Sequence, residues 1–528
     1  MIETPAPGAG PQRLHHTYAP WAVDQPERTA LQDATLRIAY GALPDAVSRL
    51  AEALAGLGIR GGDRVMLVGE NSVALALTIL ALSHLDAWST TVNARLSQRE
   101  IGNVFEHSGA RRALYFDRDS PEAGHHADAA AAQSVALPAI RDVRVGPLVE
   151  TTPEPVFDAG AEQVAALVYT SGTTGAAKGV MLTHANLLFV ANNSLRNRRL
   201  VPTDVVYGVL PLSHVYGLSS LLGATLISGG SLLLVPRFDP KALAQALRDD
   251  GLTVLHGVPA MYARLLDWAR QTGTTLSAPA LRVAQAGGAP LTAPLKAAFE
   301  DTFGLVLHNG YGMTEASPSI CQTRMDAPRS DCSVGQAIPG IEIRLHDAED
   351  PESATDSGQQ GGPERVGELR VRGPNIMKGY YRAPDATAAV LDADGWLRTG
   401  DLARIEADGA VFIVGRAKEL IIRSGFNVYP VEVEQALNAH PDVVQSAVVG
   451  RDTDGNEEVI AFVETVAGRP LDEDALMRHL RDNLSPYKLP ARIVRLPNLP
   501  ATATGKVLKA ELRRMAVELD RSPKDTHS

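Results

Sequence analysis

A glycine-rich stretch with several hydroxyl groups and one lysine lies between two apolar runs. It extends from Tyr169 to Val180 and reads Tyr-Thr-Ser-Gly-Thr-Thr-Gly-Ala-Ala-Lys-Gly-Val. Glycines let backbone N–H groups converge on an anion, while hydroxyl groups and Lys178 add donors and one positive charge. The stretch lacks the G-x-x-x-x-G-K-[ST] pattern and returns to an extended run instead of a helix. It therefore predicts a polyphosphate-binding loop between strands, the alternative being a flexible surface turn.

The composition is that of a large globular protein with a net negative charge. The 528 residues are 45% hydrophobic and 21% charged, and 50 Lys and Arg against 61 Asp and Glu give a formal charge of -11. At about 150 residues per domain, this length predicts roughly three domains' worth of chain. We expect no nucleic-acid or membrane-surface partner, because no basic stripe is present. The basic cluster Arg196, Arg198 and Arg199 is interpreted as a solvated helix end.

The cysteines and the N-terminus favour a reducing, cytoplasmic location. Cys321 and Cys332 lack metal-ligand spacing, so we expect neither a disulfide framework nor a zinc site. Residues 1–13 are rich in Pro and Gly and do not resemble a signal peptide. The longest apolar stretch, Leu218–Val235, is interrupted by Ser228–Ser231. It predicts a buried helix followed by a strand, and not a membrane span.

Helical and extended patterns alternate along most of the first 330 residues. Residues 64–68 predict a buried strand, residues 73–85 a helix, and Ser97 with Glu100 a capping box. Little beyond one strand is predicted for residues 118–160. The alternation predicts an α/β fold with parallel sheets, helices on their faces, and ligands beyond the carboxyl ends of the strands.

The pattern changes in the last 200 residues. Residues 331–413 are predicted to form a small, mostly β subdomain of short strands and turns, and Asp347–Arg365 a mobile surface loop. From Leu420 onward, short strands mix with helices over about 110 residues, a plausible size for an independent domain.

Five further segments join the glycine-rich loop in a fixed order. They are Tyr311–Glu315, Thr399–Asp401, Gly415–Glu419, Ser424–Pro430 and Pro500–Lys506. The set resembles the adenylate-forming superfamily of acyl-CoA synthetases, aryl-CoA ligases, luciferase and peptide-synthetase adenylation domains, over about residues 30 to 515. The resemblance implies an α/β N-terminal domain of helix-layered sheets over residues 1–415, including a β-barrel-like subdomain. A hinge at 416–419 and a mobile α+β domain at 420–528 would follow.

The resemblance also implies a two-step ligase reaction. A carboxylic acid and ATP would form acyl-AMP and pyrophosphate with Mg²⁺, and the acyl group would then pass to coenzyme A. Lys506 would bridge the carboxylate and the α-phosphate, and Glu315 would bind the metal. ATP or AMP would contact Thr170, Ser171, Gly172, Thr173, Thr174, Gly175, Lys178, Gly288, Ala289, Asn309, Gly310, Tyr311, Gly312, Met313, Thr314, Asp401 and Arg416. Among these, Asp401 would accept hydrogen bonds from the ribose and Tyr311 would pack on adenine.

The second step implies a domain rotation. Lys418 would be the hinge, and Ser424, Gly425 and Phe426 would contact coenzyme A. Gly425 would lie against the pantetheine arm, where a Cβ could obstruct the tunnel.

The resemblance places the acyl pocket at His214, Val215, Tyr216, Ala286, Gly287, Met313, Ser317 and Ile320. His214 is a candidate for catalysis but is better interpreted as a residue at the pocket mouth. No acidic residue stands among these positions, which disfavours an amino acid. No arginine does either, which disfavours malonate-like acids unless one approaches from elsewhere. We therefore expect an aromatic, arylalkenoic or medium-to-long-chain acid.

Two alternatives to a CoA ligase stay open, as does a homodimer. The chain could be an acyl-AMP ligase that loads a carrier protein. It could also be a non-catalytic nucleotide- or acyl-binding regulator, although the retained Glu315, Asp401, Arg416 and Lys506 argue against that.

Overall fold

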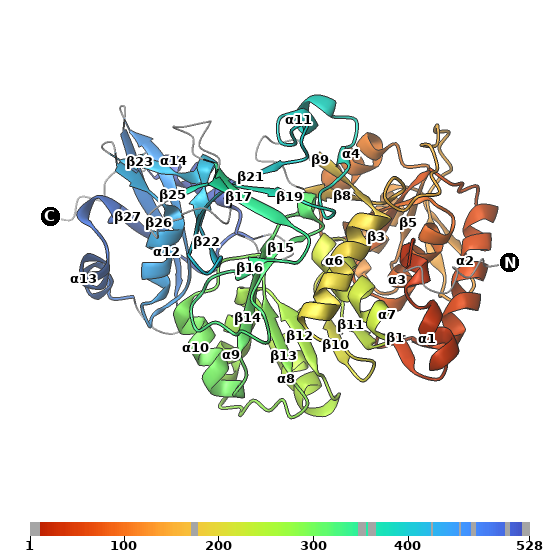
Figure 1. Cartoon of the computed structure of the whole chain (residues 1–528), viewed down its shortest axis with the longest axis horizontal. Coiled ribbons are helices and arrows are strands. Elements are labelled where there is room, and N and C mark those ends of the chain that lie inside the picture. The colour runs from red at the N-terminus through yellow and green to blue at the C-terminus, as the bar shows by residue number, and fades with distance from the viewer. Residues whose placement is uncertain are drawn as a thin grey trace.

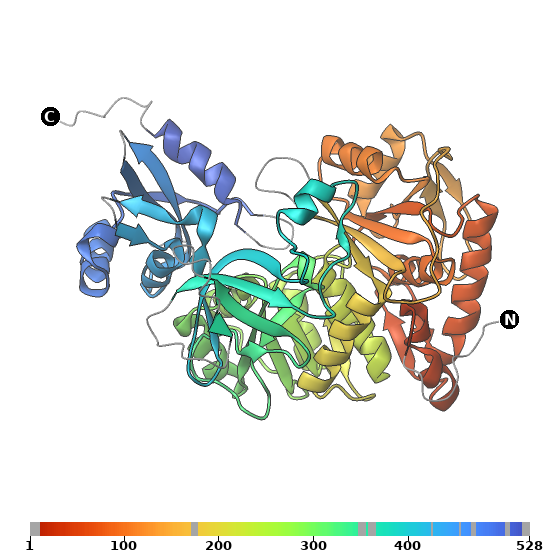
Figure 2. The ribbon, with the colours of Figure 1, turned by 45° about the horizontal axis from the view of Figure 1, so that its top comes forward.

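The elements lie along one long axis in the computed structural model. It describes residues 11–170, 178–346, 355–356, 366–423, 426–453, 456–465, 471–501 and 507–519. The first 130 residues occupy one end and the C-terminal elements the other, with the sheet of residues 205–322 between them (Figures 1 and 2). The N-terminal elements and the C-terminal elements thus form opposite ends of the molecule.

One mixed sheet holds the strands on both sides of the glycine-rich loop. In spatial order it contains β20 (Gly379–Tyr380), β9 (Lys178–Thr183), β8 (Val164–Thr170), β4 (Trp88–Asn93), β3 (Arg64–Gly69), β5 (Arg112–Tyr115), β7 (Val143–Val145) and β6 (Gln133–Val135). The four strands from β8 to β5 are parallel, and the pairs at both edges are antiparallel. The predicted parallel sheet is confirmed at its centre and extended by antiparallel edges.

A second mixed sheet forms the middle of the molecule. In spatial order it contains β16 (Gln336–Ala337), β15 (Ser319–Gln322), β14 (Leu307–Gly312), β13 (Val283–Ala286), β12 (Val254–Gly257), β10 (Val205–Gly208), β11 (Ser231–Leu234), β1 (Thr29–Gln32) and β2 (Arg37–Ala39). The strands from β14 to β1 are parallel. Their carboxyl ends therefore share one edge, where the motifs after residues 210, 286 and 308 come together.

Helices cover both sheets. They are α1 (Ala19–Asp24), α2 (Leu43–Gly56), α3 (Val73–His84), α4 (Gln98–Ser108), α5 (Pro121–Ala129), α6 (His184–Asn197), the π-helix η3 (Tyr216–Gly223), α7 (Ala224–Ser228), α8 (Pro240–Asp249), α9 (Pro259–Thr272) and α10 (Ala293–Phe303). The capping box of Ser97 and Glu100 is confirmed at the start of α4. The apolar stretch from Leu218 forms η3, α7 and β11, as predicted. Among the described residues, no helix is long and apolar enough to cross a membrane.

An antiparallel sheet follows. Its strands are, in spatial order, β18 (Thr355–Asp356), β17 (Glu342–His346), β19 (Gly367–Arg372), β21 (Leu397–Ile405) and β22 (Val411–Arg416), with α11 (Pro384–Ala388) in a crossing loop. The loop predicted over Asp347–Arg365 lies outside the described residues, apart from β18. This sheet presents Asp401 and Arg416 from neighbouring strands.

The C-terminal elements have hydrophobic clusters of their own. They are β23 (Ile421–Arg423), β24 (Phe426–Val428), α12 (Pro430–Asn438), β25 (Val443–Thr453), β26 (Asn456–Thr465), α13 (Glu473–Asn483), β27 (Arg492–Leu496) and α14 (Lys509–Glu518). Their buried apolar residues form two clusters between Ile421 and Ala516, whereas the main cluster ends at Val411. No core residue is therefore shared across residues 412–420.

Two sequence-based expectations need correction. Residues 118–160 contain α5, β6 (Gln133–Val135) and β7 (Val143–Val145), where one strand was expected. Arg198 is fully buried, although Arg196 and Arg199 beside it are exposed. The interpretation of all three as a solvated helix end is therefore wrong for Arg198.

Candidate functional site

A continuous cavity of about 1890 Å³ lies at the carboxyl edge of the central sheet and extends to the C-terminal elements. Most of the residues predicted to bind nucleotide line it. These are Thr170, Lys178, Gly288, Ala289, Asn309, Gly310, Tyr311, Gly312, Met313, Thr314, Glu315, Asp401 and Arg416. Segments more than 200 residues apart in sequence are thus brought to one cavity.

The glycine-rich stretch lies, in sequence, between two strands that pair antiparallel. Thr170 ends β8, Lys178 begins β9, and the two residues are direct partners in the ladder. Ser171, Gly172, Thr173, Thr174 and Gly175 lie outside the described residues. The return to an extended run, and the absence of a helix after the loop, are confirmed. Lys178 Nζ lies 4.8 Å from the centre of the Tyr380 ring, which suits a cation–π contact.

Tyr380 also contacts the predicted metal ligand. Its hydroxyl donates a hydrogen bond of 2.7 Å to Glu315 Oε1, and both residues are buried. Burial, and next to it the Glu315 carboxylate, raise the pKa of Tyr380, so the hydroxyl keeps its proton at neutral pH. A carboxylate beside a phosphate-binding loop suits Mg²⁺, which prefers one or two carboxylates together with phosphate oxygens. Glu315 therefore fits the role of metal ligand.

Three polar side chains form the predicted ribose site. The buried Asp401 accepts a hydrogen bond from the Tyr311 hydroxyl at Oδ2 and from Arg416 Nε at Oδ1, the latter at 2.9 Å. Burial and the nearby Asp401 hold the pKa of Tyr311 well above its usual value. Although burial disfavours its charge, Asp401 raises the pKa of Arg416. The two hydrogen bonds hold the Asp401 side chain in place as an acceptor for hydroxyl donors.

The predicted acyl pocket is divided by the structure. His214, Tyr216, Gly287 and Met313 line the cavity, and a Cβ on Gly287 would lie 3.1 Å from the Tyr216 ring. Val215, Ala286, Ser317 and Ile320 are fully buried and are not lining residues. These four side chains therefore lie in the protein core and not on the surface of the cavity.

The imidazole ring of His214 is oriented by a hydrogen bond from a backbone N–H two residues away. Its Nδ1 accepts a hydrogen bond from the Tyr216 backbone N–H at 3.2 Å. That nitrogen is therefore unprotonated, and in the neutral ring Nε2 carries the hydrogen. This tautomer suits a residue at the pocket mouth that donates through Nε2.

The C-terminal elements contribute lining residues that are close in sequence to the predicted catalytic lysine. Lys506 lies outside the described residues, but Val507 forms a bridge with Ala501 and lines the cavity, as does Lys509. Val507 and Lys509, which follow the Pro500–Lys506 segment, therefore line the same cavity as the nucleotide motifs.

A partly buried ion triad joins Glu419, the residue after the predicted hinge at Lys418, to helices α12 and α14. Lys509 Nζ lies 3.0 Å from Glu419 Oε2 and 2.8 Å from Glu434 Oε1. Burial disfavours the charge on Lys509, yet the two carboxylates raise its pKa. Lys418, the predicted hinge, lies in η5 (Ala417–Glu419) and lines the cavity.

The predicted coenzyme A residues are only partly described. Ser424 and Gly425 lie outside the described residues. Phe426 is 55% exposed and stacks on Tyr487, with ring centroids 4.7 Å apart. It does not line the cavity.

Sequence reasoning missed Tyr380, Gln285 and Arg198. Tyr380 reaches Glu315 only because the short β20 pairs with β9, and no local pattern predicts that pairing. Gln285 lies in β13 beside the glycine pair and could have been included as a neighbour of Ala286. Arg198 donates a hydrogen bond to Gln285, which is 87 residues away in sequence, so no local pattern reveals the contact.

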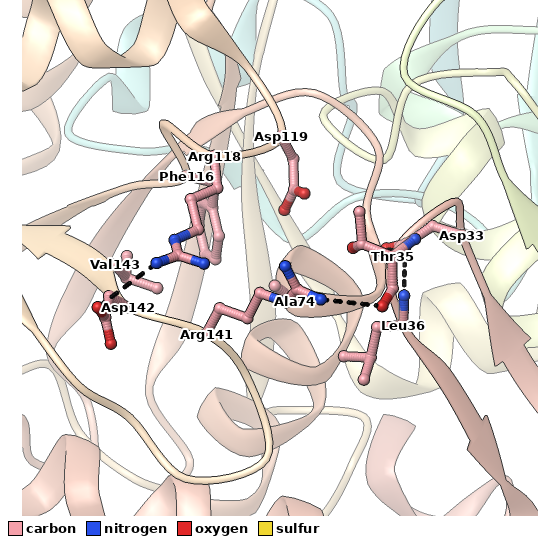
Figure 3. Close-up of a pocket in the computed structure, with 10 residues that line it drawn as sticks. All are labelled: Asp33, Thr35, Leu36, Ala74, Phe116, Arg118, Asp119, Arg141, Asp142 and Val143. Carbon is pink, nitrogen blue, oxygen red and sulfur yellow. Dashed lines mark hydrogen bonds and ion pairs between the residues drawn. The ribbon is translucent and has the colours of Figure 1, made fainter.

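A second, smaller pocket lies elsewhere, between the start of β2 and residues 116–143. Figure 3 shows that its charged groups face one another: Arg141 donates to the Thr35 carbonyl, and Arg118 pairs with Asp142 at 3.7 Å. It contains none of the motif residues. Its polar groups mainly complete the local loop structure.

Comparison with known proteins agrees with this geometry. The family model described as AMP-binding enzyme matches residues 19–381, and the model described as AMP-binding enzyme C-terminal domain matches residues 432–506. The chain belongs to this family of adenylate-forming enzymes.

Individual relatives cover nearly the whole chain. A feruloyl-CoA synthase of Amycolatopsis sp is 36% identical over 93% of this chain and 96% of its own. A 2-succinylbenzoate–CoA ligase of Geobacillus kaustophilus is 33% identical, with coverages of 93% and 95%. The structure of the O-succinylbenzoate coenzyme A synthetase of Bacillus subtilis, in complex with ATP and magnesium ion, superposes with a TM-score of 0.78 at 29% identity, covering 94% of this chain and 98% of that one. The chain is thus an acid–CoA ligase of the AMP-binding enzyme family.

Proposed function

We propose that this ligase joins an aromatic or arylalkenoic carboxylic acid to coenzyme A through an acyl-AMP intermediate. The observation that carries the proposal is the single cavity shared by Lys178, Glu315, Asp401 and the flank of the Lys506 loop. The acyl side of that cavity is lined by apolar or small groups, among them Leu210, Val258, Gly287 and Met313. The feruloyl-CoA synthase relative, whose named product carries an arylalkenoic acyl group, supports the same choice.

Charge neutralisation is the main contribution of this site to the first step. Lys178 would hold the outer phosphates, and Glu315 would hold Mg²⁺, which supplies positive charge across the phosphate oxygens. Asp401 would accept the ribose hydroxyls, with Arg416 fixing its orientation. Lys506 would approach the α-phosphate from the C-terminal domain, because Val507 and Lys509 already face the cavity. Such preorganised donors stabilise charge that develops in the transition state.

The second step would follow rotation of residues 420–528 about Lys418. The rotation would replace the Lys506 loop with residues 424–426 at the cavity, since the thiol must reach the same acyl group. Separate hydrophobic clusters on either side of the hinge support a movement of this kind. We also propose a cytosolic location, supported by two free cysteines, Cys321 and Cys332.

Pyrophosphate release tests the proposal. The purified chain would receive ATP, Mg²⁺ and cinnamic, ferulic, benzoic, octanoic or palmitic acid, with and without coenzyme A. We expect release with arylalkenoic acids without coenzyme A, and a thioester when it is added. Preference for palmitic acid would refute the substrate class. Acyl-AMP that coenzyme A does not consume would instead indicate transfer to a carrier protein.

A further inference from the structure

A buried arginine without a carboxylate partner stands behind the cavity wall. Arg198 follows α6 directly and has no exposed surface. Burial lowers its pKa only to about 10, so it is charged at neutral pH. Among the residues that the structure describes, no Asp or Glu pairs with it, and its Nη2 has no hydrogen-bond partner. A buried charge in neutral surroundings is costly and calls for an explanation beyond packing.

Two interactions account for the position of Arg198 but do not neutralise it. Its Nη1 donates a hydrogen bond of 2.7 Å to the Thr323 carbonyl oxygen. Because Arg198 directly follows α6, its positive charge also lies at the C-terminus of a helix, where a cation is stabilised. His256 and His308 stand nearby, and burial, followed by Arg198 itself, lowers the pKa of each to about 3. Both histidines are therefore neutral, and Arg198 is the cation of this cluster.

The third interaction of Arg198 fixes a glutamine of the cavity wall. Arg198 Nε donates a 2.5 Å hydrogen bond to Gln285 Oε1. Because a guanidinium only donates, the carbonyl oxygen of Gln285 must face Arg198 and its NH₂ group must face away. A Cβ built on Gly310 would lie 3.1 Å from Gln285 Nε2, so the NH₂ group lies over that glycine. Gln285 and Gly310 both line the cavity.

A neighbouring glutamine, Gln322, also has its amide orientation fixed by a donor that bonds to its carbonyl oxygen. Asn197 Nδ2 donates to Gln322 Oε1 at 2.7 Å, and Gln322 Nε2 donates to Ser319 Oγ at 3.2 Å. Gln322 is thus satisfied inside the protein. For Gln285, no described residue accepts a hydrogen bond from Nε2. The wall formed by β13, β14 and β15 therefore offers unused N–H donors at Gln285, with a positive charge behind them.

The sheet register places these donors on the acyl side of the site. Gln285 pairs with His308, on the amino-terminal side of the motif Asn309–Glu315. It also precedes the glycine pair at 287 and 288, which lies at the carboxyl edge of β13. Gln285 is therefore deeper in the sheet than the nucleotide motifs, where the part of the acid remote from its activated carboxylate would lie.

We propose that Arg198 is a positioning residue that fixes the Gln285 amide as a donor, so that the enzyme selects acids bearing an oxygen acceptor at the remote end. This inference rests on the proposed function and deepens it. The acceptor can be a neutral ether or phenol oxygen, or a second carboxylate, and the charge on Arg198 favours the carboxylate. Gln285 makes the contact, while Arg198 acts through it.

The test compares near-isosteric cinnamic acids that carry 4-ethyl, 4-methoxy or 4-carboxy groups. Pyrophosphate release without coenzyme A gives kcat and KM for each acid. The wild type should have a KM about fivefold lower for 4-methoxycinnamate than for 4-ethylcinnamate, the effect of one neutral hydrogen bond of about 1 kcal/mol. A KM for 4-carboxycinnamate below that for 4-methoxycinnamate would identify a carboxylate as the preferred acceptor. Equal KM values for these two acids would identify the neutral oxygen as the preferred acceptor. Equal KM values for ethyl and methoxy acids would overturn the inference, whereas no release with any of the acids would overturn the proposed function.

Variants separate positioning from folding. In Arg198→Met, the methoxy preference should disappear through KM, with kcat for 4-ethylcinnamate within about twofold of wild type. Arg196→Met, an exposed arginine two residues away, should leave every value unchanged. Gln285→Glu gives Arg198 a carboxylate, so it should fold even if Arg198→Met does not, and it should reverse the preference and disfavour 4-carboxycinnamate. Equal losses on all acids in these variants, or an unchanged preference in Gln285→Glu, would refute a positioning role.

Discussion

Replacement of Tyr380 by phenylalanine tests how the site holds its metal ligand. The ring, and with it the contact 4.8 Å from Lys178 Nζ, stays in place, while the hydroxyl that donates to Glu315 is removed. Both partners are buried, so the hydrogen bond to the carboxylate is worth about 1.5–3 kcal/mol. That range corresponds to a roughly 10- to 150-fold loss in kcat/KM for MgATP if Glu315 acts only in this orientation. Pyrophosphate release at varied Mg²⁺ measures the effect.

A matched control lies one residue away. The Tyr381 hydroxyl donates to Glu154 Oε1 at 2.6 Å, and neither residue lines the cavity. Tyr381→Phe therefore removes a comparable tyrosine–glutamate bond without touching the site, and it should lower stability but not the use of MgATP. Transfer of acyl from supplied acyl-AMP should be normal in both variants. Equal MgATP kinetics in Tyr380→Phe and Tyr381→Phe would refute the role given to Tyr380.

Four further outcomes follow from the site and the core. Lys178→Ala should raise KM for ATP at least about tenfold, the loss of a charged hydrogen bond, and spare the half-reaction from acyl-AMP; an unchanged KM would contradict the phosphate role. Lys506→Ala should lower acyl-AMP formation at least about 100-fold but spare thioester formation from acyl-AMP, and equal loss of both would exclude that assignment. Lys418→Pro should block thioester formation and spare adenylation; normal overall turnover would argue against a hinge there. Burial, followed by His16, His84 and Arg13, lowers the pKa of His15 to about 2. Below pH 6.5 this one histidine should therefore contribute about 1.4 kcal/mol per pH unit to the loss of stability, so the slope measured by urea unfolding should be shallower by about that amount in His15→Asn, and an equal slope in both proteins would contradict this.

Sequence patterns predicted the features whose causes are local. The capping box at Ser97 and Glu100 is four residues long, and the helix at 73–84 needs only its apolar residues and Ser72 as N-cap. The motifs at residues 311 and 401 were predicted to serve one nucleotide, and they do meet through a hydrogen bond. Their meeting brings together β14 of the central sheet and β21 of the antiparallel sheet, so the shared motif order predicted it and no local pattern did.

The features that were missed depend on contacts between distant segments. Arg198 looks like a surface residue because two arginines beside it are exposed, yet the chain turns after α6 and buries it against Gln285 and Thr323. The division of the acyl pocket was missed for a related reason. Val215 and Tyr216 are adjacent in sequence, but only the side chain of Tyr216 reaches the cavity.

Two ion groups lie on opposite sides of the predicted hinge at Lys418. Asp401 and Arg416 belong to the segment before Lys418, and Glu419, Glu434 and Lys509 to the segment after it. A rotation at Lys418 would separate the partners of neither group. The triad Glu419, Glu434 and Lys509 would move together with the C-terminal domain, which also contains Lys506. The domain could then alternate between the positions for acyl-AMP formation and for thioester formation without breaking either ion group.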